Sequence, residues 1–227
     1  FFINMNILVL GGCGFVGTNL VNQILKLKKN YKVKVIDIQW FGNNLKNNKN
    51  LKIIKKDIRN LDLQDFKDID VVIHLANIAN DPSVELLETL SWDINVLSTN
   101  KIMDLCIKAK VKKFIFASSG SVYGVKKEKR VTENLDLVPI SIYNKTKMIA
   151  ERIIFSYKEK IKIYCIRPAT VCGYSERLRL DLTVNMLTLQ ALKNKEITVY
   201  GGSQIRPNIN INDLSRLYIL FIEKNPK

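Results

Sequence analysis

The sequence predicts a doubly wound α/β fold, in which a parallel sheet is covered by helices on both faces. Apolar, β-branched runs alternate along the chain with amphipathic helical stretches, and parallel strands buried on both faces are typically such continuous apolar runs. The first run ends in a cluster of glycines that opens a helical stretch. No internal repeat or low-complexity linker interrupts the alternation, and 227 residues with 47% apolar content can bury one sizeable core.

The expected elements follow one another in a regular order. Strands are expected at residues 6–12, 32–38, 51–58, 70–76, 111–119 and 161–169. Helical patterns run from residue 15 to about 28, from about 84 to 110, and from about 143 to 157. After Pro168 the alternation weakens, and we expect a helix near 182–193, a short strand at 197–201 ("ITVYG") and a last helix. The chain is therefore predicted to divide into a domain at 5–170 and the start of a substrate-binding region at 171–227, partly interleaved with the first.

Composition limits the classes of partner. The formal charge is +15, but the lysines are spread along the chain without interleaved aromatics, so we expect no nucleic-acid partner. A phosphate-bearing small substrate fits that charge as well. Four scattered cysteines and one histidine predict no metal site, and reduced thiols in a cytoplasmic protein. No apolar run reaches the roughly 20 residues of a membrane helix, so no membrane partner is expected.

The glycine cluster predicts a dinucleotide site. "LGGCGFVG" at residues 10–17 satisfies Gly-x-x-Gly-x-x-Gly from Gly11 and Gly-x-Gly-x-x-Gly from Gly12. Glycines there permit a tight turn, close approach of a pyrophosphate and close packing of the helix, whose N-terminus favours phosphate. Asp37 ends the second strand, where a carboxylate accepts from a ribose 2′-OH and repels a 2′-phosphate, so NAD is favoured over NADP. A simple turn residue at the strand end is the alternative for Asp37.

Two further pieces extend this site. Asp57 and Ile58 follow the third strand, where they are placed to hydrogen-bond and pack on adenine, although an aspartate at a strand end is common. "YNKTK" puts Tyr143 and Lys147 four residues apart, on one face of a helix. A tyrosine with a pKa of about 10 is a poor base at neutral pH, but a nearby ammonium stabilises its phenolate. Any helix can contain this pair by chance, and its place between the fifth and sixth strands favours a functional role.

Taken together, the motifs resemble those of the extended short-chain dehydrogenase/reductase family, in the nucleotide-sugar epimerase/dehydratase branch that includes UDP-glucose 4-epimerases. They occur in the family's order across nearly the whole chain: "GGCGFVG", "DI" at Asp57, "HLAN" at His74, "SSGSVYG", "YNKTK", "RPATVCG" and "GGSQIRPNININD". The resemblance implies a Rossmann-type fold with a small, truncated C-terminal substrate-binding region, because family members usually continue well beyond this length.

The resemblance also implies roles for individual residues. It places NAD contacts at Gly11, Gly14, Phe15, Val16, Gly17, Asp37, Asp57, Ile58, Leu75, Ala76, Asn77, Tyr143, Lys147 and Pro168. It makes Tyr143 the acid/base, Lys147 the residue that grips the nicotinamide ribose and lowers the pKa of Tyr143, and Ser119 the hydroxyl that hydrogen-bonds the sugar O4. Asn95 is either the asparagine that holds the active-site geometry or a polar residue on a helix face.

A nucleotide-diphosphate sugar is the implied substrate. The expected contacts are Ser119, Ser121, Tyr143, Thr170, Asn185 and Arg206, and Arg177 and Arg179 either assist or are solvated surface charges. The shared chemistry of the branch oxidises the sugar at C4 to a 4-keto sugar. Dehydratases add an Asp-Glu pair shortly before "VYG", where this chain has Gly120 and Ser121.

The missing carboxylates favour an NAD-dependent epimerase that acts at C4. An NAD(P)H-dependent 4-keto-sugar reductase and a non-catalytic NAD-binding protein are the alternatives. The resemblance also implies a homodimer formed through the helices at 84–110 and 143–157, and a role in carbohydrate metabolism such as the synthesis of cell-surface polysaccharide.

Overall fold

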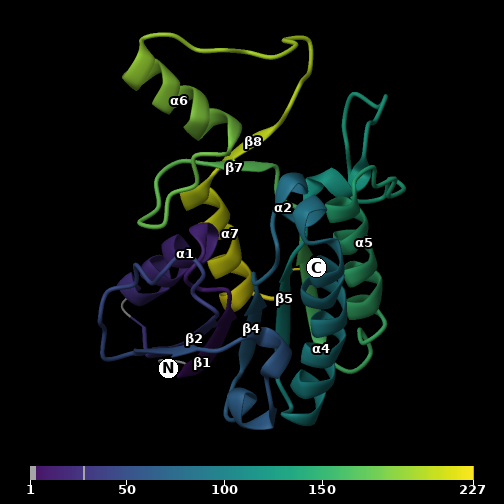
Figure 1. The fold of residues 1–227 in the computed structure, drawn as a ribbon. Coiled ribbons are helices and arrows are strands. Elements are labelled where there is room, and N and C mark those ends of the chain that lie inside the picture. The colour runs from purple at the N-terminus through teal and green to yellow at the C-terminus, as the bar shows by residue number, and fades with distance from the viewer. Residues whose placement is uncertain (1–3, 28, 227) are drawn as a thin grey trace.

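The computed structural model describes residues 4–27 and 29–226, and it confirms the doubly wound sheet. Six parallel strands lie in the order β3-β2-β1-β4-β5-β6 (Figure 1). Their bounds are β1 Met5–Leu10, β2 Tyr31–Asp37, β3 Leu51–Lys55, β4 Val71–His74, β5 Lys113–Ala117 and β6 Lys162–Ile166. The order reverses direction between β1 and β4, so a crevice opens beyond the carboxyl ends of these two strands.

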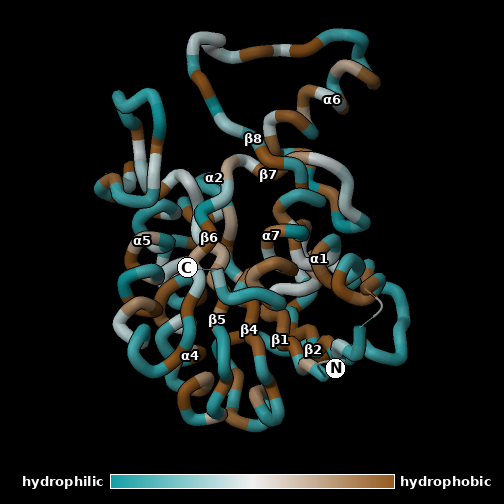
Figure 2. The backbone as a smooth tube through the Cα atoms, turned by 180° about the vertical axis from the view of Figure 1, so that it is seen from behind, coloured by the Kyte–Doolittle hydropathy of each residue, from teal (hydrophilic) through white to brown (hydrophobic). Residues whose placement is uncertain are grey.

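Helices cover both faces of the sheet and enclose two cores. On one face, α1 (Phe15–Lys26) and α7 (Ile211–Glu223) pack over Ile7 and Val9 of β1. On the other, α4 (Ser98–Lys108) and α5 (Ile142–Phe155) pack over Leu8 and Leu10. The central strands β1, β4 and β5 are accordingly rich in hydrophobic residues, which are brown in Figure 2. The predicted end of the first helix at residue 28 lies outside the described residues, and α1 ends at Lys26.

The single long helix predicted at 84–110 is wrong in detail. The segment divides into α2 (Asp81–Leu86), α3 (Glu88–Trp92), a π-helical turn η3 (Asp93–Leu97) and α4. Leu87 breaks the first two apart because its backbone leaves the helical region, with φ −138° and ψ 56°. The π-helical turn η3 buries Ile94, Asn95 and Val96, and such turns are frequent at functional sites.

The region beyond β6 stands above the carboxyl ends of the strands (Figure 1). There β7 (Thr170–Cys172) and β8 (Asn208–Asn210) form a two-stranded parallel sheet, and α6 (Thr183–Asn194) has no buried residue. The strand predicted at 197–201 is wrong, because the segment forms no ladder and is exposed, whereas 208–210 pairs with β7. The chain then returns to the sheet through α7. None of the helices at 4–27 and 29–226 is both long and apolar enough to cross a membrane.

Candidate active site at the carboxyl ends of the strands

The glycine turn after β1 has the shape of a phosphate cradle. Gly11 has a φ of +83°, and a Cβ added there would lie 2.5 Å from the backbone nitrogen of Ala76. A Cβ on Gly17 would lie 2.4 Å from the Gly11 carbonyl oxygen. The nearest atom to a Cβ on Gly14 is 3.4 Å away, so the protein itself leaves space there, where a pyrophosphate would approach. Gly14 caps α1 without a side chain, which leaves the N–H groups of the first turn to a ligand.

Asp37 lies beside this turn at the end of β2. Its carboxylate accepts hydrogen bonds from the backbone N–H of Cys13 at 2.9 Å and of Gln39 at 2.7 Å. Asp37 therefore fits both roles predicted for it. It closes a turn with Gln39, and it faces the cradle with lone pairs left for a ribose hydroxyl. The residues present fit NAD at this end of the site.

The two residues after β3 are held by the protein. Asp57 caps the 3₁₀ turn η1 (Ile58–Asn60) and pairs with the Arg59 guanidinium at 2.7 Å, which lowers the pKa of Asp57. Ile58 is buried in the core against α4. An adenine contact at this strand end would therefore involve the backbone or the rim of the Asp57–Arg59 pair.

The segment after β4 lies against the glycine turn. The N–H groups of Leu75 and Ala76 both donate to the Leu10 carbonyl at 2.9 Å, which brings this segment beside Gly11. The Asn77 amide donates to the Leu75 carbonyl, while its oxygen is buried without a partner. This unpartnered acceptor fits the expectation that Asn77 faces a ligand.

Tyr143 and Lys147 lie on the first turns of α5. Lys147 is 2% exposed, and its ammonium donates to the Ala117 carbonyl at 2.8 Å, above the Phe116 ring. Burial lowers the pKa of Lys147 to about 8. Burial likewise raises the pKa of Tyr143 to about 12, and the charge of the Arg179 guanidinium acts in the opposite direction. Without ligand, the pKa of Tyr143 thus lies above its ordinary value, and Lys147 does not reverse this.

Ser119 begins the 3₁₀ turn η4 (Gly120–Tyr123) at the end of β5. Its oxygen accepts the Ser121 N–H at 3.2 Å and lies 2.7 Å from the Ser121 hydroxyl. The Ser121 hydroxyl in turn donates to the amide oxygen of Asn144, the residue after Tyr143. Pro168 is close by, because its carbonyl accepts the Gly120 N–H at 2.8 Å. The structure therefore brings Ser119, Ser121, Tyr143, Lys147 and Pro168 to one edge of the sheet.

Sequence reasoning missed a buried ion pair beneath these groups. Glu151, 2% exposed, accepts two hydrogen bonds from the Arg167 Nε at 3.0 and 3.2 Å and one from its Nη2 at 2.7 Å. Ser118 donates to the same carboxylate, and Arg167 donates to the Tyr123 hydroxyl at 2.8 Å. The pair ties α5 to the ends of β5 and β6. Its signal in the sequence was a glutamate one turn after Lys147 and an arginine directly before Pro168.

Asn95 lies in η3 and is 2% exposed. Its amide oxygen accepts the Ile78 N–H at 2.9 Å, and its amide nitrogen donates to the Ile78 carbonyl at 3.1 Å and the Thr146 hydroxyl at 3.2 Å. It therefore joins the segment after β4 to α5. A solvated residue on a helix face would make none of these contacts, so the geometry favours the positioning alternative.

The expected substrate contacts are more dispersed. Thr170 begins β7, and the Asn185 amide is occupied by the backbone of Gly173 and Arg179. Arg179 pairs with Asp181, and its charge lowers the pKa of Tyr143, whereas Arg177 stacks on Phe41 with its guanidinium carbon 4.0 Å from the ring centre. Arg206 is exposed in the segment before β8, and the structure does not join it to the other site residues.

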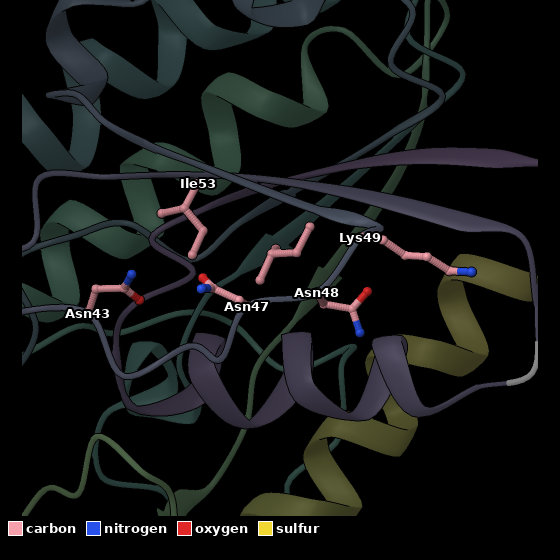
Figure 3. Close-up of a pocket in the computed structure, with 6 residues that line it drawn as sticks. Asn43, Asn47, Asn48, Lys49 and Ile53 are labelled. Carbon is pink, nitrogen blue, oxygen red and sulfur yellow. The ribbon is translucent and has the colours of Figure 1, made fainter.

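Two open hollows lie near the cofactor end. One of about 530 Å³ is lined by asparagines and Lys49 of the segment after β2 and by Leu51 and Ile53 of β3 (Figure 3). The other, of about 460 Å³, lies between Phe41 and Asn44 and the segment 176–181 that contains Arg177 and Arg179. Neither contains Tyr143 or Lys147, so the catalytic candidates lie outside both hollows. Within 4–27 and 29–226, no three His, Cys, Asp or Glu side chains gather in a metal-binding group.

Comparisons with known proteins agree with this fold. An uncharacterised UDP-glucose epimerase of Bacillus subtilis is 34% identical over 92% of this chain and 70% of its own length. A UDP-N-acetylglucosamine 4-epimerase of Methanobrevibacter ruminantium superposes with a TM-score of 0.90 at 30% identity, over 99% of this chain and 74% of the other. The UDP-glucuronic acid 4-epimerase of Bacillus cereus, solved with UDP-glucuronic acid and NAD, gives 0.86 at 32% identity, over 98% and 74%.

The profile of one protein family matches residues 7–227, which is nearly the whole chain. Its description names NAD, and the glycine cradle and Asp37 fit that cofactor. The protein is thus an NAD-dependent enzyme of the epimerase type, and the chain belongs to the NAD-dependent epimerase/dehydratase family.

Proposed function

We propose that this enzyme is a nucleotide-sugar epimerase that inverts C4 through a transient 4-keto sugar, with Tyr143 as the acid/base. The observation that carries the proposal is that the start of α5 meets the end of β5: the Lys147 ammonium donates to the Ala117 carbonyl, and Asn144, the residue after Tyr143, accepts from Ser121. The glycine cradle opens at the same edge of the sheet, so cofactor and proton-transfer groups would face one substrate.

Each residue has a part in this reaction. The glycine turn and Asp37 would hold NAD, which would supply the hydride chemistry at C4. Tyr143 removes the proton from the C4 hydroxyl and gives it back, while Ser119 holds the same oxygen. Lys147 holds the nicotinamide ribose and adds positive charge below the phenolate. Asn95 keeps the segment after β4 and α5 together through Ile78 and Thr146.

The substrate side is proposed from the C-terminal region. Residues 5–170 would hold NAD, and 171–227 would begin the part that holds the nucleoside diphosphate. Arg206 is exposed and free of ion pairs among the described residues, and a guanidinium binds two phosphate oxygens at once. The two 4-epimerase neighbours act on UDP-N-acetylglucosamine and UDP-glucuronic acid, so UDP-sugars are the substrates to test first.

Gly120 supports epimerisation over dehydration. A Cβ at this position would lie 3.1 Å from the Pro168 carbonyl oxygen, so a side chain would require the segment after β6 to shift slightly. The neighbouring Ser121 hydroxyl is bonded to Ser119 and Asn144. The site accordingly lacks carboxylates at the two positions where dehydratases of the family place theirs.

The decisive experiment incubates the purified protein with UDP-glucose, UDP-N-acetylglucosamine or UDP-glucuronic acid, and follows the C4 epimers by chromatography. We expect interconversion without consumption of added NADH, and its loss in Tyr143→Phe with NAD binding retained. Oxidation of free NADH or NADPH only in the presence of a 4-keto sugar would instead identify a reductase. Turnover by Tyr143→Phe would remove the assigned role of Tyr143.

We also propose a homodimer and a cytoplasmic location. Leu97 is 62% exposed and Phe155 40% exposed, next to α4 and at the end of α5, where a second copy would cover them. The four cysteines are free thiols, which suits a reducing compartment. Sedimentation analysis of the purified protein tests the dimer, and a mass that stays monomeric at micromolar concentration would exclude it.

A further inference from the structure

The hydroxyl groups beside Tyr143 form a chain whose direction can be worked out. Ser121 lies between Ser119 and Asn144, with its oxygen 2.7 Å from that of Ser119. An amide oxygen only accepts, so the single Ser121 proton goes to Asn144. The contact between the two serines must then use the proton of Ser119.

The catalytic serine therefore directs its proton away from the phenol. One lone pair of the Ser119 oxygen accepts the Ser121 N–H at 3.2 Å, and the other is left for a donor. A hydroxyl that donates to a phenolate lowers the pKa of the tyrosine, whereas a hydroxyl that only accepts favours the protonated phenol.

We propose that Ser121 and Asn144 are positioning residues that fix Ser119 as a hydrogen-bond acceptor toward Tyr143 in the free enzyme. In this arrangement the phenol, not Ser119, is the donor in the free enzyme. Donation by Ser119 to a phenolate requires the chain to reverse, and reversal leaves the buried Asn144 oxygen without its donor. Ser121 thereby has a role beyond the sugar contact expected from the sequence.

Charged groups near Tyr143 also affect its phenol, and they are the same in the variants at positions 121 and 144. Arg179 reaches it from the segment after β7, Asp81 from α2, and Lys147 lies one turn further along α5. None of them contacts Ser121 or the Asn144 side chain through a hydrogen bond in the described residues. Substitutions at 121 and 144 therefore change the hydroxyl chain while leaving these charges in place.

The test measures the ionisation of Tyr143 directly. The chain is produced with a fluorinated tyrosine, whose phenol ionises at lower pH, and titrated by ¹⁹F NMR without cofactor or substrate. Tyr143→Phe assigns the resonance. In Ser121→Ala and Asn144→Leu the Ser119 proton is released to the phenolate, so both midpoints should fall by about one pKa unit, the size of one hydrogen bond to a charged group.

Asn144→Asp keeps the acceptor and adds charge, so its midpoint should stay or rise. Ser141→Ala is the matched control, because Ser141 bonds only the backbone N–H of Asn144 and should leave the midpoint unchanged. Any other pattern, such as equal midpoints in all variants or a rise in Asn144→Leu, overturns the proposal. If Asn144→Leu does not fold, Ser121→Ala against Asn144→Asp decides. The catalytic meaning rests on the proposed acid/base role of Tyr143, but the titration needs no turnover, so the two can fail separately.

Discussion

Replacing Lys147 by methionine should stabilise the ligand-free enzyme while abolishing its activity. Lys147 is 2% exposed, and burial lowers its pKa from 10.5 to about 8. A difference of 2.5 units at about 1.4 kcal/mol per unit means that the charged form costs about 3 kcal/mol at neutral pH. Methionine loses the hydrogen bond to the Ala117 carbonyl, about 1 kcal/mol, so a net gain of about 2 kcal/mol is expected.

The stability difference between the two proteins should depend on pH. Below pH 8 the lysine is protonated in both the folded and the unfolded chain, and the penalty is complete. Between pH 8 and 10.5 unfolding takes up a proton, so the penalty fades as the pH rises and is absent above 10.5. Urea unfolding of Lys147→Met and the unsubstituted protein at pH 7 and 10.5 measures this. A variant less stable at pH 7, or a difference that ignores pH, would refute the reasoning.

Three further predictions concern single contacts. Gly14→Ala should fold normally yet bind NAD at least tenfold more weakly by calorimetry. Gly17→Ala should lose stability even without NAD, since its Cβ would meet a carbonyl oxygen at 2.4 Å. Equal effects of the two substitutions would contradict the roles assigned to these glycines. Arg167→Met leaves Glu151 buried with an uncompensated charge and should cost about 3–5 kcal/mol in urea unfolding, part of which Glu151→Gln in the same chain should restore. Lys113 is 7% exposed, and its ammonium donates to the last carbonyls of α7, so Lys113→Met should cost about 1–3 kcal/mol and speed hydrogen exchange there; unchanged exchange would show that the cap is dispensable.

The sheet was predictable because its signals are local. The central strands contain short apolar runs, such as residues 7–10 of β1 and 71–73 of β4, and the glycine turn and Asp37 mark the ends of β1 and β2 in the sequence itself. The break at Leu87 and the π-turn at 93–97 were not. The π-turn contains Asn95, whose contact with Ile78 joins segments 17 residues apart, and the break at Leu87 has no proline or glycine to mark it in the sequence.

The candidate site also has parts that the sequence predicted and parts that it did not. Spacing alone placed Tyr143 and Lys147 on one helix face, and motif order placed Ser119 near them. The partners of these groups come from distant segments: Arg167 is 16 residues from Glu151, and Asn144 is 23 residues from Ser121. Pairing at such separations leaves no periodic pattern, so Glu151 and Asn144 looked like ordinary helix residues. The pair β7–β8 was also missed, because strands of three residues are too short to show an alternation of apolar and polar residues.

Burial at this edge of the sheet makes base catalysis depend on ligand. With its pKa near 12, Tyr143 is about five units from serving as a base at neutral pH. One hydrogen bond to the phenolate contributes about one to two units, so Ser119 alone cannot bridge that gap. Arg179 helps, but Asp81 opposes it. The remainder requires positive charge brought close to the phenolate in a desolvated site, where charges interact most strongly. Lys147 is already bonded to Ala117 and does not meet this need before ligand binds. On the proposed mechanism we therefore expect proton abstraction by Tyr143 only in the enzyme that holds its ligands.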